Sequence, residues 1–113
     1  MRDMIFVTGP LFAGKEEYIK TTLRLTDEEF HACAVRDVQE LAADADDLTA
    51  LADRLSAFRV VIATEIGGGV VPTDERQRQV REAAGRLACL LSARADTVVR
   101  VCCGLPQVLK GKM

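Results

Sequence analysis

Residues 9–16 read Gly-Pro-Leu-Phe-Ala-Gly-Lys-Glu, and they carry the strongest indication of fold in the chain. The two glycines and Lys15 have the spacing of a phosphate-binding loop, which ends in Ser or Thr where this chain has Glu16. A short apolar run at residues 4–8 suits a strand before the loop, and residues 17–25 suit a helix after it. In such a loop, backbone N–H groups and a lysine ammonium bind a phosphate. The residues expected to contact the nucleotide are Gly9, Pro10, Ala13, Gly14, Lys15 and Glu16.

The substitution at Glu16 leaves two interpretations open. The usual hydroxyl binds Mg²⁺ beside the nucleotide. A carboxylate is able to hold a cation too, but it faces the phosphates with like charge. The motif therefore indicates nucleotide-binding ancestry more firmly than present-day hydrolysis or transfer. The alternative is a plain strand-to-helix turn, in which glycines supply backbone freedom and Glu16 and Glu17 stabilise the helix N-terminus.

Apolar runs and helical patterns alternate along the rest of the chain. The run at residues 59–64 is continuous and β-branched, as in a strand covered on both faces. The order predicts one α/β domain, residues 1–113, with a P-loop NTPase-like, mainly parallel sheet of about four strands and helices on both faces. Strands are expected at 30–38, 59–64 and 97–103, an edge strand at 107–109, and helices at 44–55 and from a cap at Thr73 to about residue 94.

Ligands of such sheets bind beyond the carboxyl ends of the strands. There we expect three loops to converge: the Gly9–Lys15 loop, residues 65–69 and residues 104–110. Lys15 is the first candidate for catalysis. Glu65 ends the central strand and is placed to ligate a cation or orient a hydroxyl, with a solvated loop carboxylate as the alternative.

Two arginines and a glycine run have weaker indications of function. Arg78 and Arg81 lie three apart on one helix face, where they either reach phosphates or a neighbouring subunit or form a solvated charged face. Gly67 to Gly69 either lets the backbone approach a ligand or permits a tight reversal.

Composition excludes several classes of partner. The net charge is −2, and no basic cluster runs longer than two residues, so binding of nucleic acid is not expected. Aromatic residues are too few for a base-stacking platform. The N-terminus lacks the features of a signal peptide, and no apolar run has the length of a membrane span, so we expect a cytoplasmic protein without membrane contact.

The cysteine and histidine content argues against a structural metal site. None of the four cysteines forms a Cys-x-x-Cys pair, and His31 is the single histidine. We expect buried, reduced thiols that pack as small hydrophobic side chains. The cysteines are Cys33, Cys89, Cys102 and Cys103.

The second half of the chain resembles a known family. Residues 60–72 are similar to its segment V-L-V-S/T-N-E-V-G-x-G-I-V-P, and residues 78–87 are similar to R-x-F-R-D-x-x-G-R-L. Residues 90–96 resemble L-A-x-x-A-D, and residues 104–110 resemble G-L-P-x-x-L-K. These motifs follow in the family's order, so the chain resembles a shortened, divergent member of the bifunctional adenosylcobinamide kinase / adenosylcobinamide-phosphate guanylyltransferase family.

The resemblance implies a role in cobalamin (corrinoid) biosynthesis or salvage. It implies a homo-oligomer that binds ATP or GTP with Mg²⁺ at the phosphate loop and phosphorylates adenosylcobinamide. It further implies transfer of GMP from GTP to the new phosphate through a histidine, and His31 lies near the place of that histidine.

Several departures from the family bear on activity. Family members are longer, and the missing length lies between the first helix and the strand at residue 60. There the family has a strand ending in D-C-L-T-x-W whose aspartate holds Mg²⁺; no aspartate at the end of a matching apolar strand is recognised here, so the metal ligands stay undefined. The family's Asn-Glu becomes Thr64-Glu65, and the loop hydroxyl becomes Glu16.

Three classes of function remain open. The first is a small nucleotide-dependent enzyme acting on corrinoids, favoured by Lys15, Glu65 and the late motifs. The second is a catalytically inactive relative that binds nucleotide or corrinoid, favoured by Glu16. The third is a structural oligomeric protein, which the retained loop glycines argue against.

Overall fold

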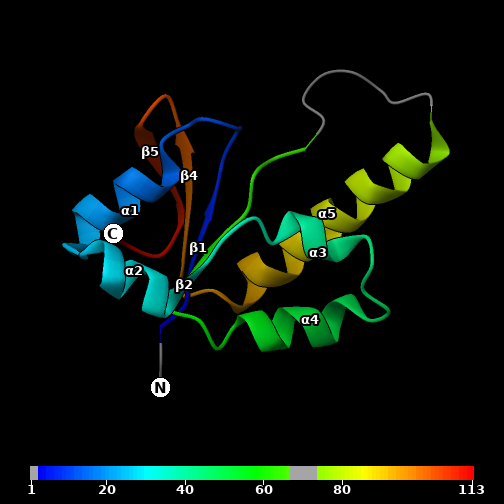
Figure 1. Cartoon of the computed structure of the whole chain (residues 1–113), viewed down its shortest axis with the longest axis horizontal. Helices are drawn as coiled ribbons and strands as arrows, with labels where there is room; N and C mark the ends of the chain where they lie inside the picture. The colour runs from blue at the N-terminus through cyan, green and yellow to red at the C-terminus, as the bar shows by residue number, and fades with distance from the viewer. Residues whose placement is uncertain (1–2, 67–73) are drawn as a thin grey trace.

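The computed structural model describes residues 3–66 and 74–113. These residues form a five-stranded sheet in the order β2-β3-β1-β4-β5 (Figure 1). Strands β1 to β4 run parallel to one another, and β5 runs antiparallel to β4. The strands are β1 (Ile5–Thr8), β2 (Ala34–Val35), β3 (Val60–Ile62), β4 (Thr97–Cys102) and β5 (Leu105–Lys110).

Helices cover both faces of this sheet, as the sequence predicts (Figure 1). One face packs against two helices near the N-terminus, and the other packs against three later ones. The α/β class and the mainly parallel sheet are therefore confirmed. The helices are α1 (Lys15–Leu23), α2 (Asp27–Cys33), α3 (Gln39–Ala42), α4 (Leu48–Leu55) and α5 (Glu75–Arg94).

The central strand β1 shows why both faces need a cover. Successive side chains of a strand point to opposite faces, and β1 is apolar at every buried position. Phe6 packs with α3, α4 and α5, whereas Ile5 and Val7 pack with Ile19 of α1 and Phe30 of α2. Both sides of β1 are removed from water, so the strand is held firmly in the core. It therefore fixes the start of the loop at residues 9–16, which follows its carboxyl end.

The region predicted as a strand at residues 30–38 is mostly wrong. Residues up to Cys33 belong to α2, and only Ala34–Val35 pair with β3. A capping box starts α2: Glu29 N donates to the Thr26 hydroxyl at 3.1 Å, and Thr26 N donates to Glu29 Oε1 at 3.0 Å. This Thr-x-x-Glu pattern is a helix-start signal that outweighs the β-branched and cysteine residues after it.

Other boundaries also differ from the expected ones. The helix expected at 44–55 is α4 alone, capped by the Asp47 side chain, which accepts from the backbone N–H groups of Thr49 and Ala50. The cap of α5 is Asp74 rather than Thr73, which lies outside the described residues together with Gly67 to Gly69. The sheet has five strands where about four were expected. The fifth is β5, which is longer than the short edge strand expected at 107–109.

The expectation of four buried thiols is wrong, because none of the four cysteines is fully buried. All four cysteines are free, but Cys89 and Cys103 are exposed and Cys33 and Cys102 are half-buried. Cys103 lies in the tight turn between β4 and β5, with a positive φ of 54°. Over residues 3–66 and 74–113, no helix combines the length and apolar character needed to cross a membrane.

Candidate functional site

The Gly9–Glu16 loop leaves the carboxyl end of β1 and leads into the first turn of α1. Gly9 has a φ of 148° and lies against β4 so closely that a Cβ atom would collide with the Val101 carbonyl oxygen. Gly14 caps α1 in the left-handed conformation, with φ 85°. These two glycines are therefore required by the backbone path, which explains their spacing in the sequence.

Backbone hydrogen bonds tie this loop to its neighbours on both sides. Glu65 N donates to Gly9 O at 2.9 Å, and Gly104 N donates to Ala13 O at 2.8 Å. The residues after β3 and after β4 thus meet the loop at one edge of the sheet. The predicted convergence of three loops is confirmed for these contacts, while residues 67–69 lie outside the described part.

Lys15 is the first residue of α1 and is only 8% exposed. Its ammonium donates to the carbonyl oxygens of Pro10 at 2.7 Å and Gly9 at 3.3 Å. Desolvation by burial lowers the pKa of Lys15, and the carboxylates of Asp37, Glu65 and Glu16, in that order, oppose this shift. A buried cation beside a helix N-terminus is the arrangement that attracts a phosphate group.

The Glu16 carboxylate is held by Arg36. Arg36 Nη1 donates to Glu16 Oε1 at 2.6 Å, joining the end of β2 to the first turn of α1. The hydrogen bond and charge of Glu16 raise the pKa of Arg36. From sequence we expected an unshielded carboxylate facing the phosphates; the structure instead gives it a cationic partner.

Glu65 also has a cationic partner. Arg100 of β4 donates to both Glu65 oxygens, from Nε at 2.7 Å and from Nη2 at 2.8 Å. These hydrogen bonds hold the pKa of Glu65 below its usual range, although partial burial opposes the shift. A carboxylate bonded in this way is an ionised acceptor, with part of its capacity for a cation or hydroxyl already used.

One acidic residue beside the loop, Asp37, was not predicted from the sequence as part of the site. Asp37 comes two residues after β2, with φ 56°, and its charge acts on Lys15. Asp37 and Lys15 line the same cavity of about 380 Å³. The sequence pattern missed this aspartate because β2 is only two residues long and Arg36 follows it directly.

Two cavities lie at this edge of the sheet and share Thr64. The smaller one, of about 230 Å³, is lined by Glu65, Arg81 and the Gln39 side chain, among others. Gln39 is buried and accepts from Thr64 N at 2.9 Å. The cavity of about 380 Å³ is lined by Phe12, Ala13, Gly14, Lys15, Glu16, Glu17, Arg36, Asp37, Ile62 and Thr64.

His31 and Arg78 lie away from these cavities. His31 is exposed in the last turn of α2, with its ring centroid 5.9 Å from that of Phe30. The carbonyl of Cys33, at the end of α2, accepts from the backbone of Arg59, which precedes β3. The end of α2 therefore lies at the amino edge of the parallel strands, opposite the Gly9–Glu16 loop (Figure 1). Arg78 is exposed on α5.

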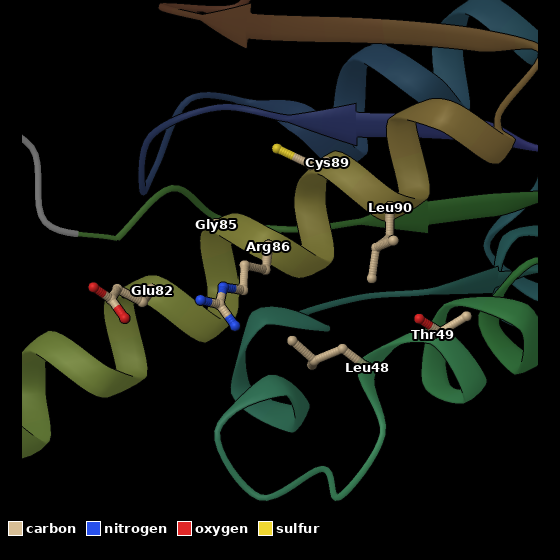
Figure 2. A pocket seen from close by; sticks show the side chains of 7 residues that line it. All are labelled: Leu48, Thr49, Glu82, Gly85, Arg86, Cys89 and Leu90. Atoms are coloured by element: carbon tan, nitrogen blue, oxygen red, sulfur yellow. The ribbon is translucent and has the colours of Figure 1, made fainter.

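A larger cavity, of about 810 Å³, lies between α4 and α5. Figure 2 shows Leu48 of α4 and Leu90 of α5 pointing into the space between the two helices, with Arg86 at its rim. Of the residues singled out from sequence as nucleotide-binding or catalytic, none lines this cavity. The convergence of charged groups is instead at the Gly9–Glu16 loop.

Metal binding at the loop would depend on oxygen ligands. Within the described residues, no group of three or more His, Cys, Asp or Glu side chains is placed to hold a metal ion. Mg²⁺ needs only one or two protein carboxylates when phosphates and water complete its shell. Asp37 fits that donor set, because it lines the cavity of Lys15 and makes no side-chain hydrogen bond within residues 3–66 and 74–113.

Arg36, Asp37 and Arg100 were not among the site residues predicted from the sequence. Arg36 and Arg100 are isolated cations in or beside strands, and their role depends on carboxylates 20 and 35 residues away. The available signal was the opposite sign of charge at the ends of neighbouring strands, which becomes visible only after the strand order is known.

Comparison with known proteins agrees with the motifs of the second half. The model of the cobinamide kinase / cobinamide phosphate guanyltransferase family matches residues 21–109. A search of curated proteins gave no match. The match covers most of the chain but begins after the Gly9–Glu16 loop. The interpretation of that loop as a phosphate site rests on the spacing of its residues and on its geometry. The chain therefore belongs to the cobinamide kinase / cobinamide phosphate guanyltransferase family.

Proposed function

We propose that this protein binds a nucleoside triphosphate at the Gly9–Glu16 loop and acts on a corrinoid in cobalamin biosynthesis or salvage. The family supplies the class of substrate. In the proposed reaction the γ-phosphoryl group of ATP or GTP passes to the hydroxyl of adenosylcobinamide, and a nucleoside diphosphate leaves. The strand–loop–helix context of the loop supports a nucleotide site of the P-loop NTPase type.

The position of Lys15 is the observation that carries this proposal. Its buried ammonium donates to the loop carbonyls of Gly9 and Pro10, and two glycines force the loop around it. A lysine that merely begins a surface helix is solvent-exposed, whereas only 8% of Lys15 is exposed. A bound phosphate would exchange those carbonyl contacts for charge-assisted hydrogen bonds, which are stronger than neutral ones.

Mg²⁺ fits the site through Asp37, which lines the cavity of Lys15, while Glu16 stays bonded to Arg36. When bound, Mg²⁺ neutralises charge that develops on the phosphates. The protein's own part is to hold and orient. Lys15 holds the phosphate, the loop backbone donates to it, and the Thr64 and Gln39 region offers space for the acceptor beside Glu65.

A second candidate is a relative that binds nucleotide or corrinoid without transferring phosphate. Three observations favour it: the loop hydroxyl is replaced by Glu16, Glu65 is bonded to Arg100, and the last turn of α2, which carries His31, lies at the opposite edge of the sheet. A guanylyl transfer through His31 stays a prediction from the family resemblance, because its place in α2 gives no contact with the loop within one chain.

One experiment separates these two functions. The purified protein is titrated with ATP and GTP, with and without Mg²⁺, and is then incubated with adenosylcobinamide and γ-labelled nucleotide. Lys15-dependent binding together with label in the corrinoid supports the enzyme. Lys15-dependent binding without transfer supports the second candidate. Absence of nucleotide binding in all conditions contradicts both.

A further inference from the structure

A negative charge lies next to the lysine that is proposed to hold phosphate. Glu16 follows Lys15 directly, its charge acts on Lys15, and both side chains line the cavity of about 380 Å³. A phosphate bound to Lys15 would lie within reach of this carboxylate. Like charges at such separations disfavour each other, so an unshielded Glu16 would weaken phosphate binding.

The cavity as a whole has more acidic than basic side chains. Among the described residues, its lining holds two cations, Lys15 and Arg36, against three carboxylates, from Glu16, Glu17 and Asp37. Without Arg36, Lys15 would be the one cation that faces these three carboxylates among the lining residues described by the structure. The cavity therefore depends on Arg36 for much of its ability to accept an anion.

The contact between Arg36 and Glu16 is direct and spans two elements. Arg36 Nη1 donates to Glu16 Oε1 at 2.6 Å, across 20 residues of sequence. The side chains are 50% and 34% exposed. Exposed ion pairs contribute little to folding stability. The main consequence of this pair is therefore local: it fixes and neutralises one carboxylate at the proposed phosphate site.

We propose that Arg36 is a positioning residue for phosphate binding, which acts through Glu16. The guanidinium holds the carboxylate on the β2 side of the cavity and balances its charge, so that Lys15 and the loop backbone are able to take a nucleotide phosphate. Glu16 and Arg36 together replace the neutral hydroxyl of the usual loop. This inference rests on the proposed function, since it assumes that the loop binds nucleotide.

A double-mutant cycle tests this role, with Mg²⁺–ATP and Mg²⁺–GTP as probes in calorimetric titrations. Arg36→Ala should weaken binding by about fivefold or more, because it exposes the Glu16 charge. In the Glu16→Gln background, the same Arg36→Ala change should alter binding by less than about twofold, because no charge remains to be balanced. This loss of effect distinguishes a positioning role from a direct contact.

Two outcomes overturn the inference alone. One is Lys15-dependent binding that Arg36→Ala leaves unchanged. The other is an equal loss of affinity in both backgrounds, which would make Arg36 a direct phosphate ligand. Absence of binding by the unmodified protein would overturn the proposed function and this inference together.

Arg94→Ala is the matched control for the cycle. It removes another partly exposed ion pair, Arg94 Nε to Asp53 Oδ1 at 2.7 Å, which joins α5 to α4 away from the loop. Nucleotide binding by the Arg94→Ala protein should equal that of the unmodified chain. Circular dichroism of each variant confirms that the fold is retained.

Discussion

Arg100 and Glu65 form two hydrogen bonds, of 2.7 and 2.8 Å, from the strand on one side of β1 to the residues after the strand on its other side. Glu65 also donates its backbone N–H to Gly9, where the loop begins. The pair therefore links β3, β4 and the start of the loop at the carboxyl edge of the sheet. It holds the start of the loop in place, independently of any role of the Glu65 carboxylate in a reaction.

The first prediction concerns the pH dependence of this pair. Arg100 lowers the pKa of Glu65 below its ordinary value of 4.5, so the pair stabilises the fold above that pH and loses its effect as the pH falls through the lowered pKa. The Glu65→Gln protein should be less stable than the unmodified chain at pH 7 by less than about 1 kcal/mol, since both side chains are partly exposed. Urea unfolding at pH 7 and pH 3 measures the difference, which should shrink at pH 3. A constant difference would contradict the ionic origin.

The second prediction concerns Lys15. The Lys15→Ala protein should bind ATP and GTP at least about tenfold more weakly, equivalent to about 1.4 kcal/mol, because the charged donor to phosphate is lost. Titration calorimetry measures the affinity. Lys20→Ala is the control, since Lys20 lies on the same helix but pairs with Glu17 and Asp27. Equal affinity of the Lys15→Ala and unmodified proteins would show that the loop is vestigial.

The third prediction concerns the missing hydroxyl. The Glu16→Ser protein should bind Mg²⁺–nucleotide more tightly, because it regains a metal-ligating hydroxyl and loses a like charge. Titrations with and without Mg²⁺ should show that the gain is larger with the metal. Glu28→Ser serves as control, since that carboxylate is exposed in the first turn of α2 and lines neither cavity at the loop. Weaker binding by Glu16→Ser would mean that the carboxylate has taken over the role of holding the cation.

The fourth prediction compares two glycines. The Gly9→Ala protein should lose on the order of 3 kcal/mol of folding stability, because its Cβ would collide with the Val101 carbonyl and its φ of 148° disfavours alanine. Gly85 lies inside α5 with open space at its Cβ position, so Gly85→Ala should be neutral or stabilising by up to about 1 kcal/mol. Thermal unfolding of both variants gives the comparison. Equal melting temperatures would argue against the close packing of Gly9 on β4.

The fifth prediction is that the protein forms a homo-oligomer. Every residue of β5 is exposed, including Leu105, Val108 and Leu109, and Leu11 and Phe12 of the loop are exposed as well. Apolar surface of this kind favours association. Light scattering across micromolar concentrations should give a mass above that of one chain, 12.3 kDa. Replacing Val108 and Leu109 by serine should lower that mass if β5 lies in the contact. A monomer mass throughout would contradict the prediction.

Local patterns in the sequence were enough to predict much of the architecture. The glycine and lysine spacing of residues 9–15 predicted the strand–loop–helix junction. The signal is local, because Gly14 caps α1 directly before Lys15 and the Lys15 ammonium bonds to carbonyl groups of the same loop. The continuous apolar runs predicted β1, β3 and β4, because a strand covered on both faces needs apolar side chains at every position. The family motifs of the second half were readable for the same reason, since they are contiguous in sequence.

The tertiary structure alone decided how the charges of the site are balanced. Glu16 and Glu65 look like unpaired carboxylates in the sequence, yet each binds an arginine 20 or 35 residues away. Asp37 follows a strand too short to give a periodic signal, and its place beside Lys15 comes from the pairing of β2 with β3. Electrostatic interactions depend on distance in space, and distances between separate elements are set by strand order and helix packing rather than by local sequence.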